Sequence, residues 1–400
     1  MHNAEAVLKN KSRKKKKIFL LEGVLTNYRV PVFKRLSAFN DIDLVVFSIP
    51  PTRAQRKEAL RMVRTVNEFN HKLIPCVSIG SKILLPKFAW YIIKERPDIV
   101  ILQIMDYLCL FICKLLKIPF IWWTSGTPAC FKPEVRKGAL QKLLSKMHIR
   151  TRIAFLSDAI IVYSESGKEY LISKGKSSES IFVAYNSMDT EELLKYRQAI
   201  EKNSSIVEKM QANYNLKGKK VILFVGRLIK SHRVDLLLNA FYLIQQHMND
   251  VSLLIVGEGP EFPALLKLKK QLKLRNVFFL GPIYDNWELS KLFYLTDVYV
   301  IPGACSLTAK FAMTFSKPVV SVACGLEVYS IENGRNGFIT TPGDYKEFAN
   351  RILELLSNKE LRERMGKGAY KTIKEKVNIH KMIKGFQDAI EYVSHGWDFQ

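Results

Sequence analysis

The residues best suited to chemistry lie in short segments of the second half of the chain. The first segment is Gly226-Arg227-Leu228, with Lys230, His232 and Arg233 just after it. The permanently charged guanidinium of Arg227 can hold a phosphate through two parallel hydrogen bonds. An arginine in an ordinary surface loop would give the same pattern, so position alone leaves both interpretations open.

Two further segments combine glycine and small residues, as phosphate-binding loops do. Gly257-Glu258-Gly259-Pro260 lets the backbone approach a ligand, although the same pattern describes many strand-to-helix turns. The segment 302–308 places small residues ahead of a predicted helix, whose free N–H groups can bind a diphosphate. Capping of that helix by Ser306 or Thr308, with no ligand at all, is the alternative.

Each of these segments follows a predicted β-strand. Short apolar runs alternate with longer helical patterns, which is typical of parallel sheets with crossover helices. We predict strands in the first half at 18–21, 44–47, 99–103, 119–123, 159–163 and 181–184. In the second half we predict them at 221–225, 252–256, 277–280, 298–301, 318–322 and 338–340. The predicted fold class is α/β, with two doubly wound sheets that bind ligands outside the carboxyl ends of their strands.

The chain length of 400 residues suits two domains. We expect a basic tail at 1–17, one domain at 18–190, a linker region at 191–217, a second domain at 218–377 and a C-terminal helix at 378–400. That helix has the option of packing back on the N-terminal domain. The longest apolar region, 99–123, is interrupted by charged residues, so no membrane span is expected. The apolar run after the basic tail ends at Glu22 and is too short for a signal peptide.

Net charge is the unusual property of the composition. The chain carries a net charge of +25, although its 48% hydrophobic and 25% charged residues are ordinary for a globular protein. Residues 1–190 hold 32 Lys and Arg against 15 Asp and Glu, with a cluster at 53–64. This excess indicates an anionic membrane surface or a phosphate-bearing substrate, with a solvated surface or a lysine-rich coding bias as alternatives. No nucleic-acid-binding motif is present, so nucleic acid is not expected.

The sequence predicts no metal site. The six cysteines show no Cys-x-x-Cys pair, and none lies near a histidine at ligand spacing. They suit reduced thiols in a cytoplasmic protein. The one Asp-x-Asp run, Asp41-Ile42-Asp43, precedes a predicted strand and is therefore expected to lie away from the ligand-binding edge.

The order of the motifs is more specific than any one of them. After the three segments come Lys317-Pro318-Val319-Val320, Asn336-Gly337 and Pro342-Gly343-Asp344, and residues 27–33 form an opening motif near the start. In this order the chain resembles the retaining glycosyltransferases of family 4, of the bacterial cell-surface polysaccharide type. The resemblance implies the GT-B fold, with two facing Rossmann-like domains. It also implies transfer of a sugar, with retention, from a nucleoside diphosphate sugar to a growing lipid-linked glycan at the cytoplasmic face of a membrane.

The resemblance also implies roles for particular residues. Arg227 is the expected catalytic residue, because it would stabilise the departing diphosphate. No cofactor or metal is expected beside the nucleotide sugar. Asp106 is a second catalytic candidate, and the acceptor side is expected to include Gly23, Arg29, Thr124 and Ser125. The expected donor-binding residues are Gly226, Arg227, Lys230, His232, Gly257, Glu258, Gly259, Ile283, Gly303, Ala304, Cys305, Ser306, Leu307 and Thr308.

Three positions depart from the family pattern. His232 stands where the family has a lysine, and a neutral imidazole holds a diphosphate less well than an ammonium group. The family's pair of glutamates falls on Gly303 and Phe311, and no histidine lies between Ile99 and Pro128. These departures support a second hypothesis, a non-catalytic glycan- or membrane-binding homologue with a degraded donor site.

Overall fold

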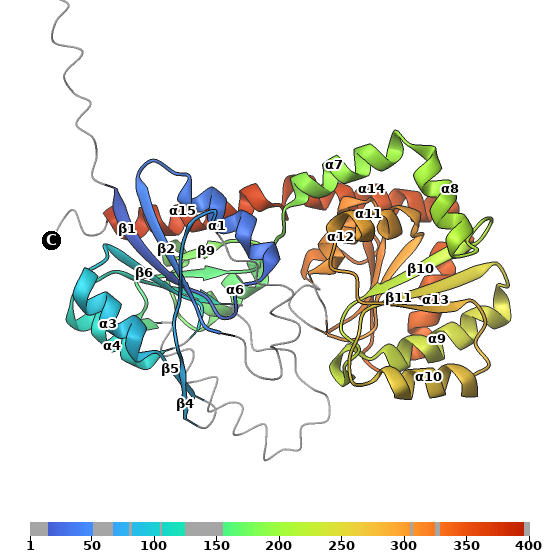
Figure 1. Cartoon of the computed structure of the whole chain (residues 1–400), viewed down its shortest axis with the longest axis horizontal. Coiled ribbons are helices and arrows are strands. Elements are labelled where there is room, and N and C mark those ends of the chain that lie inside the picture. The colour runs from blue at the N-terminus through green and yellow to red at the C-terminus, as the bar shows by residue number, and fades with distance from the viewer. Residues whose placement is uncertain are drawn as a thin grey trace, which may run out of the picture.

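The computed structural model describes residues 15–50, 67–79, 82–104, 106–124, 155–304, 307–324 and 329–395. These residues form two α/β domains that stand side by side (Figure 1). Each domain is built on a parallel sheet with helices on both faces. This double coverage explains why most strands are apolar along their whole length.

The N-terminal domain has a seven-stranded sheet in the order β3-β2-β1-β6-β7-β8-β9. All of its neighbouring strands are parallel. The order reverses between β1 and β6, and open α/β sheets bind their ligands at such a reversal. The strands are β1 (Lys16–Leu21), β2 (Ile42–Ser48), β3 (Asn70–Leu73), β6 (Ile99–Leu102), β7 (Phe120–Thr124), β8 (Ala159–Val162) and β9 (Ile181–Val183).

Helices from both ends of the chain cover this sheet. One face carries α3 (Pro86–Glu95), α4 (Tyr107–Leu115) and α6 (Glu165–Ser173). The other face carries α1 (Val30–Ser37) and α15 (Ile379–His395). Figure 1 shows the red helix α15 lying over the blue and green N-terminal domain. Phe386 of α15 is fully buried there, with its ring 4.9 Å from that of Trp123.

The C-terminal domain has a six-stranded sheet in the order β12-β11-β10-β13-β14-β15. Every neighbouring pair is again parallel, and the order reverses between β10 and β13. Its strands are β10 (Lys220–Val225), β11 (Val251–Val256), β12 (Val277–Gly281), β13 (Val298–Ile301), β14 (Val319–Val322) and β15 (Gly337–Thr340).

Eight α-helices among the described residues cover the two faces of this sheet. One group is α9 (Val234–His247), α10 (Phe262–Gln271) and α13 (Tyr345–Ser357). The other is α7 (Thr190–Glu201), α8 (Ser204–Asn213), α11 (Asn286–Leu295), α12 (Thr308–Thr314) and α14 (Lys359–Glu375).

Two parts of the chain differ from the sequence-based expectations. The segment 191–217, expected as a linker region, forms most of α7 together with α8, and its Leu193, Ile200 and Met210 are buried within the C-terminal domain. Strand β3 and the hairpin of β4 (Val77–Ile79) and β5 (Lys82–Leu84) were not expected. They are short, and β3 has the polar sequence Asn-His-Lys-Leu, so they lack the apolar pattern on which strand prediction depends.

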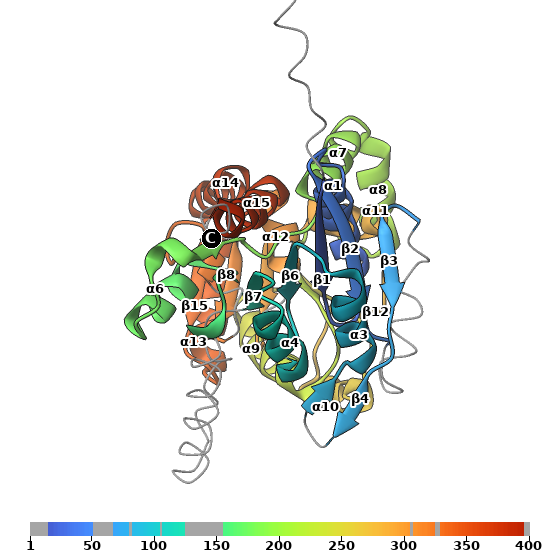
Figure 2. The ribbon, with the colours of Figure 1, turned by 90° about the vertical axis from the view of Figure 1, so that its left-hand side faces the viewer.

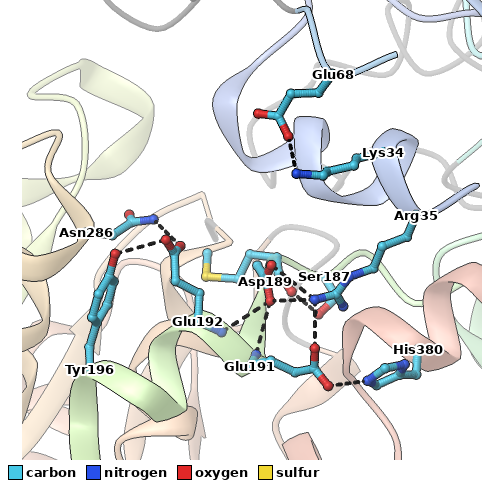
Figure 3. Close-up of polar contacts among 11 residues, drawn as sticks. Lys34, Arg35, Glu68, Ser187, Asp189, Glu191, Glu192, Tyr196, Asn286 and His380 are labelled. Atoms are coloured by element: carbon cyan, nitrogen blue, oxygen red, sulfur yellow. Dashed lines mark hydrogen bonds and ion pairs between the residues drawn. The ribbon is translucent and has the colours of Figure 1, made fainter. Parts of the chain in front are cut away.

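The two connections between the domains run side by side. The chain enters the C-terminal domain at α7 and returns through Val377 to α15, and the Ser187 hydroxyl donates to the carbonyl oxygen of Val377 over 3.4 Å. Arg35 of α1 donates to Glu191 at the start of α7 over 2.7 Å. Glu191 also pairs with His380 of α15, as Figure 3 shows. These contacts hold the two connections together and tie them to α1 and α15.

None of the described helices combines the length and apolar sequence needed to cross a membrane.

Candidate functional site

Loops from four neighbouring strands meet at the carboxyl end of the C-terminal sheet. The loop after β10 contacts the loop after β11, because the Leu228 amide donates to the carbonyl oxygen of Glu258 over 2.9 Å. The Gly257 amide donates in turn to the carbonyl oxygen of Gly281, at the end of β12. The predicted segments 226–233 and 257–260 are therefore adjacent in space.

Gly257 is required by the closeness of these loops. A Cβ atom at this position would lie only 1.8 Å from the carbonyl oxygen of Gly226. No other residue type fits while the two backbones keep this distance. The glycine pattern in this segment thus has a structural cause, in addition to any role with a ligand.

The loop after β13 packs against the short helix η3 (Lys230–His232). The Ala304 amide donates to the carbonyl oxygen of Ser231 over 2.9 Å. A Cβ atom at Gly303 would lie 2.4 Å from that same oxygen, so position 303 can hold no side chain while η3 lies here. This contact explains one departure from the family pattern, because a glutamate at 303 would collide with η3.

The second departure also has a structural cause. Phe311 of α12 is buried and stacks on Phe293 with 4.4 Å between ring centroids. It also stacks on Phe315, so the three rings form part of the core under the sheet. A glutamate at position 311 would have to enter this apolar cluster unpaired, at considerable cost.

The charged groups of this site are largely exposed to solvent. Arg227, Lys230 and Glu258 all have exposed side chains. The Tyr284 hydroxyl donates to the Glu258 carboxylate over 2.8 Å, which connects the loops after β11 and β12. Ile283, one of the expected donor-binding residues, is half-buried beside this contact.

His232 is held in one neutral form. Its Nδ1 lies 2.8 Å from the carbonyl oxygen of Arg227, and a carbonyl can only accept, so Nδ1 carries the proton. Burial lowers the pKa of His232, the backbone hydrogen bond opposes this, and the positive charge of Arg227 adds to the lowering. At neutral pH the remaining nitrogen, Nε2, is therefore an acceptor and cannot donate to a phosphate.

The other predicted donor residues lie in or beside these same loops. Gly226 and Gly259 flank the contacts already described, and Leu307 and Thr308 begin α12. Thr308 hydrogen-bonds the hydroxyl of Tyr299, which orients its side chain toward β13. Cys305 and Ser306 lie outside the described residues.

On the N-terminal side, Gly23 and Arg29 both lie near the reversal in strand order. The Gly23 amide donates to the side-chain oxygen of Gln103 over 3.1 Å, which joins the loops after β1 and β6. The Arg29 side chain is only 2% exposed and donates from Nε to Glu22 over 3.0 Å. Its guanidinium also lies over the ring of Trp123, at 4.6 Å. Arg29, expected to contact the acceptor, is instead occupied by this buried ion pair.

Asp106 has a structural role in place of the catalytic one that was expected. It is fully buried and caps α4, accepting hydrogen bonds from the amides of Leu108 and Cys109. Its second carboxylate oxygen accepts from the Leu85 amide over 2.7 Å. With three backbone donors and no exposed surface, this carboxylate is satisfied within the core. Thr124 is half-buried at the end of β7, and Ser125 lies outside the described residues.

Sequence reasoning did not single out Glu22 as a functional residue. Its carboxylate is 3% exposed, and within the described chain Oε2 has no hydrogen-bond partner. Burial raises the pKa of Glu22 to about 7, although Arg29 acts in the opposite direction. The available signal was an acidic residue directly after an apolar strand, at the predicted ligand-binding edge.

A small pocket beside the connections between the domains is lined by side chains from both domains. Tyr163 and Tyr185 come from the N-terminal domain, and Lys310 and Tyr329 come from the C-terminal domain. Lys310 lies on α12 and is only 2% exposed. The pocket has room for little more than a water molecule, so its lysine and tyrosines pack close together between the domains. Within the described part of the chain, no cluster of His, Cys, Asp and Glu is placed to hold a metal.

Comparison with known proteins agrees with this geometry. Residues 206–372 match the family described as Glycosyl transferases group 1. The crystal structure of Anabaena Alr3699/HepE in complex with UDP superposes with a TM-score of 0.69, over 94% of this chain and 99% of that one, at 16% identity. The same protein is known in complex with UDP-glucose. Residues 206–372 are thus similar to group 1 glycosyltransferases, and the chain has the GT-B fold.

Two curated relatives match this chain over more than half of its length. N-acetyl-alpha-D-glucosaminyl L-malate synthase from Bacillus anthracis is 24% identical, over 62% of this chain and 70% of the relative. The capsular polysaccharide biosynthesis glycosyltransferase CapM from Staphylococcus aureus is also 24% identical, over 58% and 60%. The first three relatives are matched over 45% to 70% of their own length.

Replacing Glu22 with Gln tests whether the buried carboxylate of Glu22 has a raised pKa. Its pKa of about 7 lies above the ordinary value of 4.5, so between these pH values the native state binds more protons than the unfolded state. The free energy of unfolding should therefore fall as pH rises through this window, by on the order of 3 kcal/mol. The Glu22→Gln variant should lack this pH-dependent decrease in the free energy of unfolding.

The measurement is urea unfolding at several pH values between 4.5 and 8. Glu354→Gln, at an exposed carboxylate of α13, is the matched control and should keep the wild-type pH profile. If Glu22→Gln and the control gave the same profile, the carboxylate of Glu22 would not titrate in this range.

Proposed function

We propose that this chain is an enzyme that transfers a sugar from a nucleoside diphosphate sugar to a growing, lipid-linked glycan during synthesis of a cell-surface polysaccharide. The observation that carries the proposal is the meeting of the loops after β10, β11, β12 and β13 at the reversal in strand order, with Arg227 exposed among them. Retention of the anomeric configuration follows from the sequence resemblance.

A uridine diphosphate sugar is the proposed donor. The similar HepE fold binds UDP and UDP-glucose, and the matched family domain of this chain contains all four loops. In this proposal Arg227 binds the diphosphate as negative charge develops on it, and Lys230 adds a second positive charge nearby. No metal is part of the proposal.

The acceptor is proposed on different grounds. The strong positive charge of the first half suits a lipid diphosphate or the anionic surface that carries it. A location at the cytoplasmic face of a membrane would bring the chain to such an acceptor. CapM is an example of a similar protein with a role in capsular polysaccharide biosynthesis.

A non-catalytic homologue remains the second candidate, and a specific observation favours it. Neither Gly303 nor Phe311 provides the carboxylate found at these positions in the family, and the packing around both excludes one. A protein of this kind would bind a glycan or a membrane without turning over a donor. Donor binding separates the two candidates.

Arg227→Ala should weaken the binding of UDP at least tenfold, because losing a charged hydrogen bond costs about 1.5–3 kcal/mol. Isothermal titration calorimetry of the full chain measures this change. Arg364→Ala, at an exposed arginine on α14, is the matched control and should bind as the wild type does. Equal affinities in all three proteins would remove Arg227 from the site, and a folded wild type that binds no nucleoside diphosphate would favour the non-catalytic candidate.

His232→Lys should change how binding depends on pH. Because His232 is neutral at pH 7, it can donate to a diphosphate only after Nε2 gains a proton, so the affinity for UDP-glucose should rise as pH falls from 8 to 6. A lysine is charged throughout this range and should bind more tightly at pH 8 with a flatter profile. His247→Lys, at an exposed histidine of α9, is the control. An affinity that does not vary with pH in the wild type would contradict this role of His232.

A further inference from the structure

Helices α3 and α4 expose an unusual number of large apolar side chains. They pack side by side on the part of the N-terminal domain that lies away from the C-terminal domain (Figures 1 and 2). Phe111 and Leu115 of α4 are 66% and 69% exposed, and Trp90 and Ile93 of α3 are each 49% exposed. Tyr107 and Leu108 are exposed as well. We call these six side chains the α3–α4 face.

The apolar residues of each helix recur at helical spacing. Trp90 and Ile93 are three residues apart, and Tyr107, Phe111 and Leu115 are four apart, so each set forms a stripe along its helix. The opposite sides of both helices are also apolar, because they are buried against the sheet. Single exposed apolar residues are normal on a protein surface, whereas a contiguous group on two adjacent helices marks an interaction surface.

Lysines flank the apolar stripes. Lys87 and Lys94 are exposed on α3, and Lys117 is exposed just after α4. The Lys94 ammonium lies 4.6 Å above the ring of Trp90, so the cation and the aromatic ring share one surface. No carboxylate of the described chain pairs with these three lysines, whereas Lys114 pairs with Asp158. All three lysines therefore add positive charge to the exposed surface around the apolar stripes.

We propose that the α3–α4 face docks on an anionic lipid bilayer. The apolar side chains would enter the boundary between headgroups and acyl chains, and the lysines would contact lipid phosphates. Aromatic rings beside lysines are the residue types that suit this boundary.

The positive charge of the α3–α4 face favours an anionic bilayer over a second copy of the chain as its partner. In a two-fold dimer through this face, the same patch meets itself, so Lys87, Lys94 and Lys117 would be brought toward their own copies. Like charges brought together in this way oppose association. An anionic surface instead complements them, and the net charge of +25 attracts the whole protein toward it.

This inference rests on the proposed function and names the surface through which the chain would contact the membrane. Binding to the membrane can be tested separately from binding of the nucleotide sugar. The α3–α4 face belongs to the N-terminal domain, whereas the loops proposed to bind the nucleotide belong to the C-terminal domain. Vesicle binding can therefore fail while nucleotide binding remains, and the reverse also holds.

The test is binding of the full chain to vesicles of phosphatidylcholine with and without phosphatidylglycerol, measured by flotation. We expect the wild type to bind the anionic vesicles and the double variant Phe111→Ser/Leu115→Ser to bind them at least tenfold more weakly. The control variant Ile172→Ser/Tyr242→Ser changes two side chains that are each 40% exposed on α6 and α9, and it should bind as the wild type does. Circular dichroism and thermal melting verify that each variant is folded.

A second measurement tests whether Trp90 lies among the lipid acyl chains. Brominated lipids quench a tryptophan that lies among acyl chains, so Trp90→Phe should remove a fraction of the quenching seen in the wild type. The proposal is overturned if the wild type does not bind anionic vesicles, or if the Phe111→Ser/Leu115→Ser variant binds them as the control does. A wild-type dimer that this variant dissociates, with no vesicle binding, would show instead that the face joins two copies of the chain.

Discussion

In each of the two sheets every strand runs parallel to its neighbours, so all the loops at the carboxyl ends of one sheet must leave by the same edge. Where the strand order reverses, between β1 and β6 and between β10 and β13, successive crossovers go to opposite faces and the loops separate. The candidate site depends on this constraint. It brings segments that are up to 80 residues apart in the sequence, such as Gly23 and Gln103, within hydrogen-bond distance.

The crowding of loops at one edge explains the residues found there. In the C-terminal domain the loop after β10 lies against those after β11 and β13, and the backbones touch at Gly257 and Gly303. Side chains are excluded at these contacts, so the ligand-binding chemistry is left to the groups that point outward, above all Arg227. The same packing holds His232 against the Arg227 carbonyl oxygen and keeps it neutral.

The two domains are joined at more than one point. Helix α15 comes from the end of the chain but completes the N-terminal core, and its Met382 accepts a hydrogen bond from the buried Arg29. The ion pair of Arg29 and Glu22 therefore connects the end of β1 with the segment that returns from the C-terminal domain.

The sequence predicts the fold class well, because strands covered on both faces are apolar throughout and stand out from their surroundings. The α/β class and the two Rossmann-like domains are confirmed. Strand β3 was not identified, because it is polar and short. The buried residues of α7 and α8 are separated by polar ones, so this segment was expected as a linker region and not as part of the C-terminal domain. Side-chain roles are harder still. Asp106 and Arg29 are polar residues beside strand ends, and only the structure shows that backbone amides and Glu22, respectively, already occupy them.

The central claim is that the loops at the C-terminal reversal in strand order hold the diphosphate of a nucleotide sugar. A crystal structure of the full chain with UDP-glucose tests this most directly. The account predicts the diphosphate within hydrogen-bond distance of the Arg227 guanidinium, beside the carboxyl ends of β10 and β13. A nucleotide bound elsewhere on the chain, with Arg227 free of contact to it, would contradict the account.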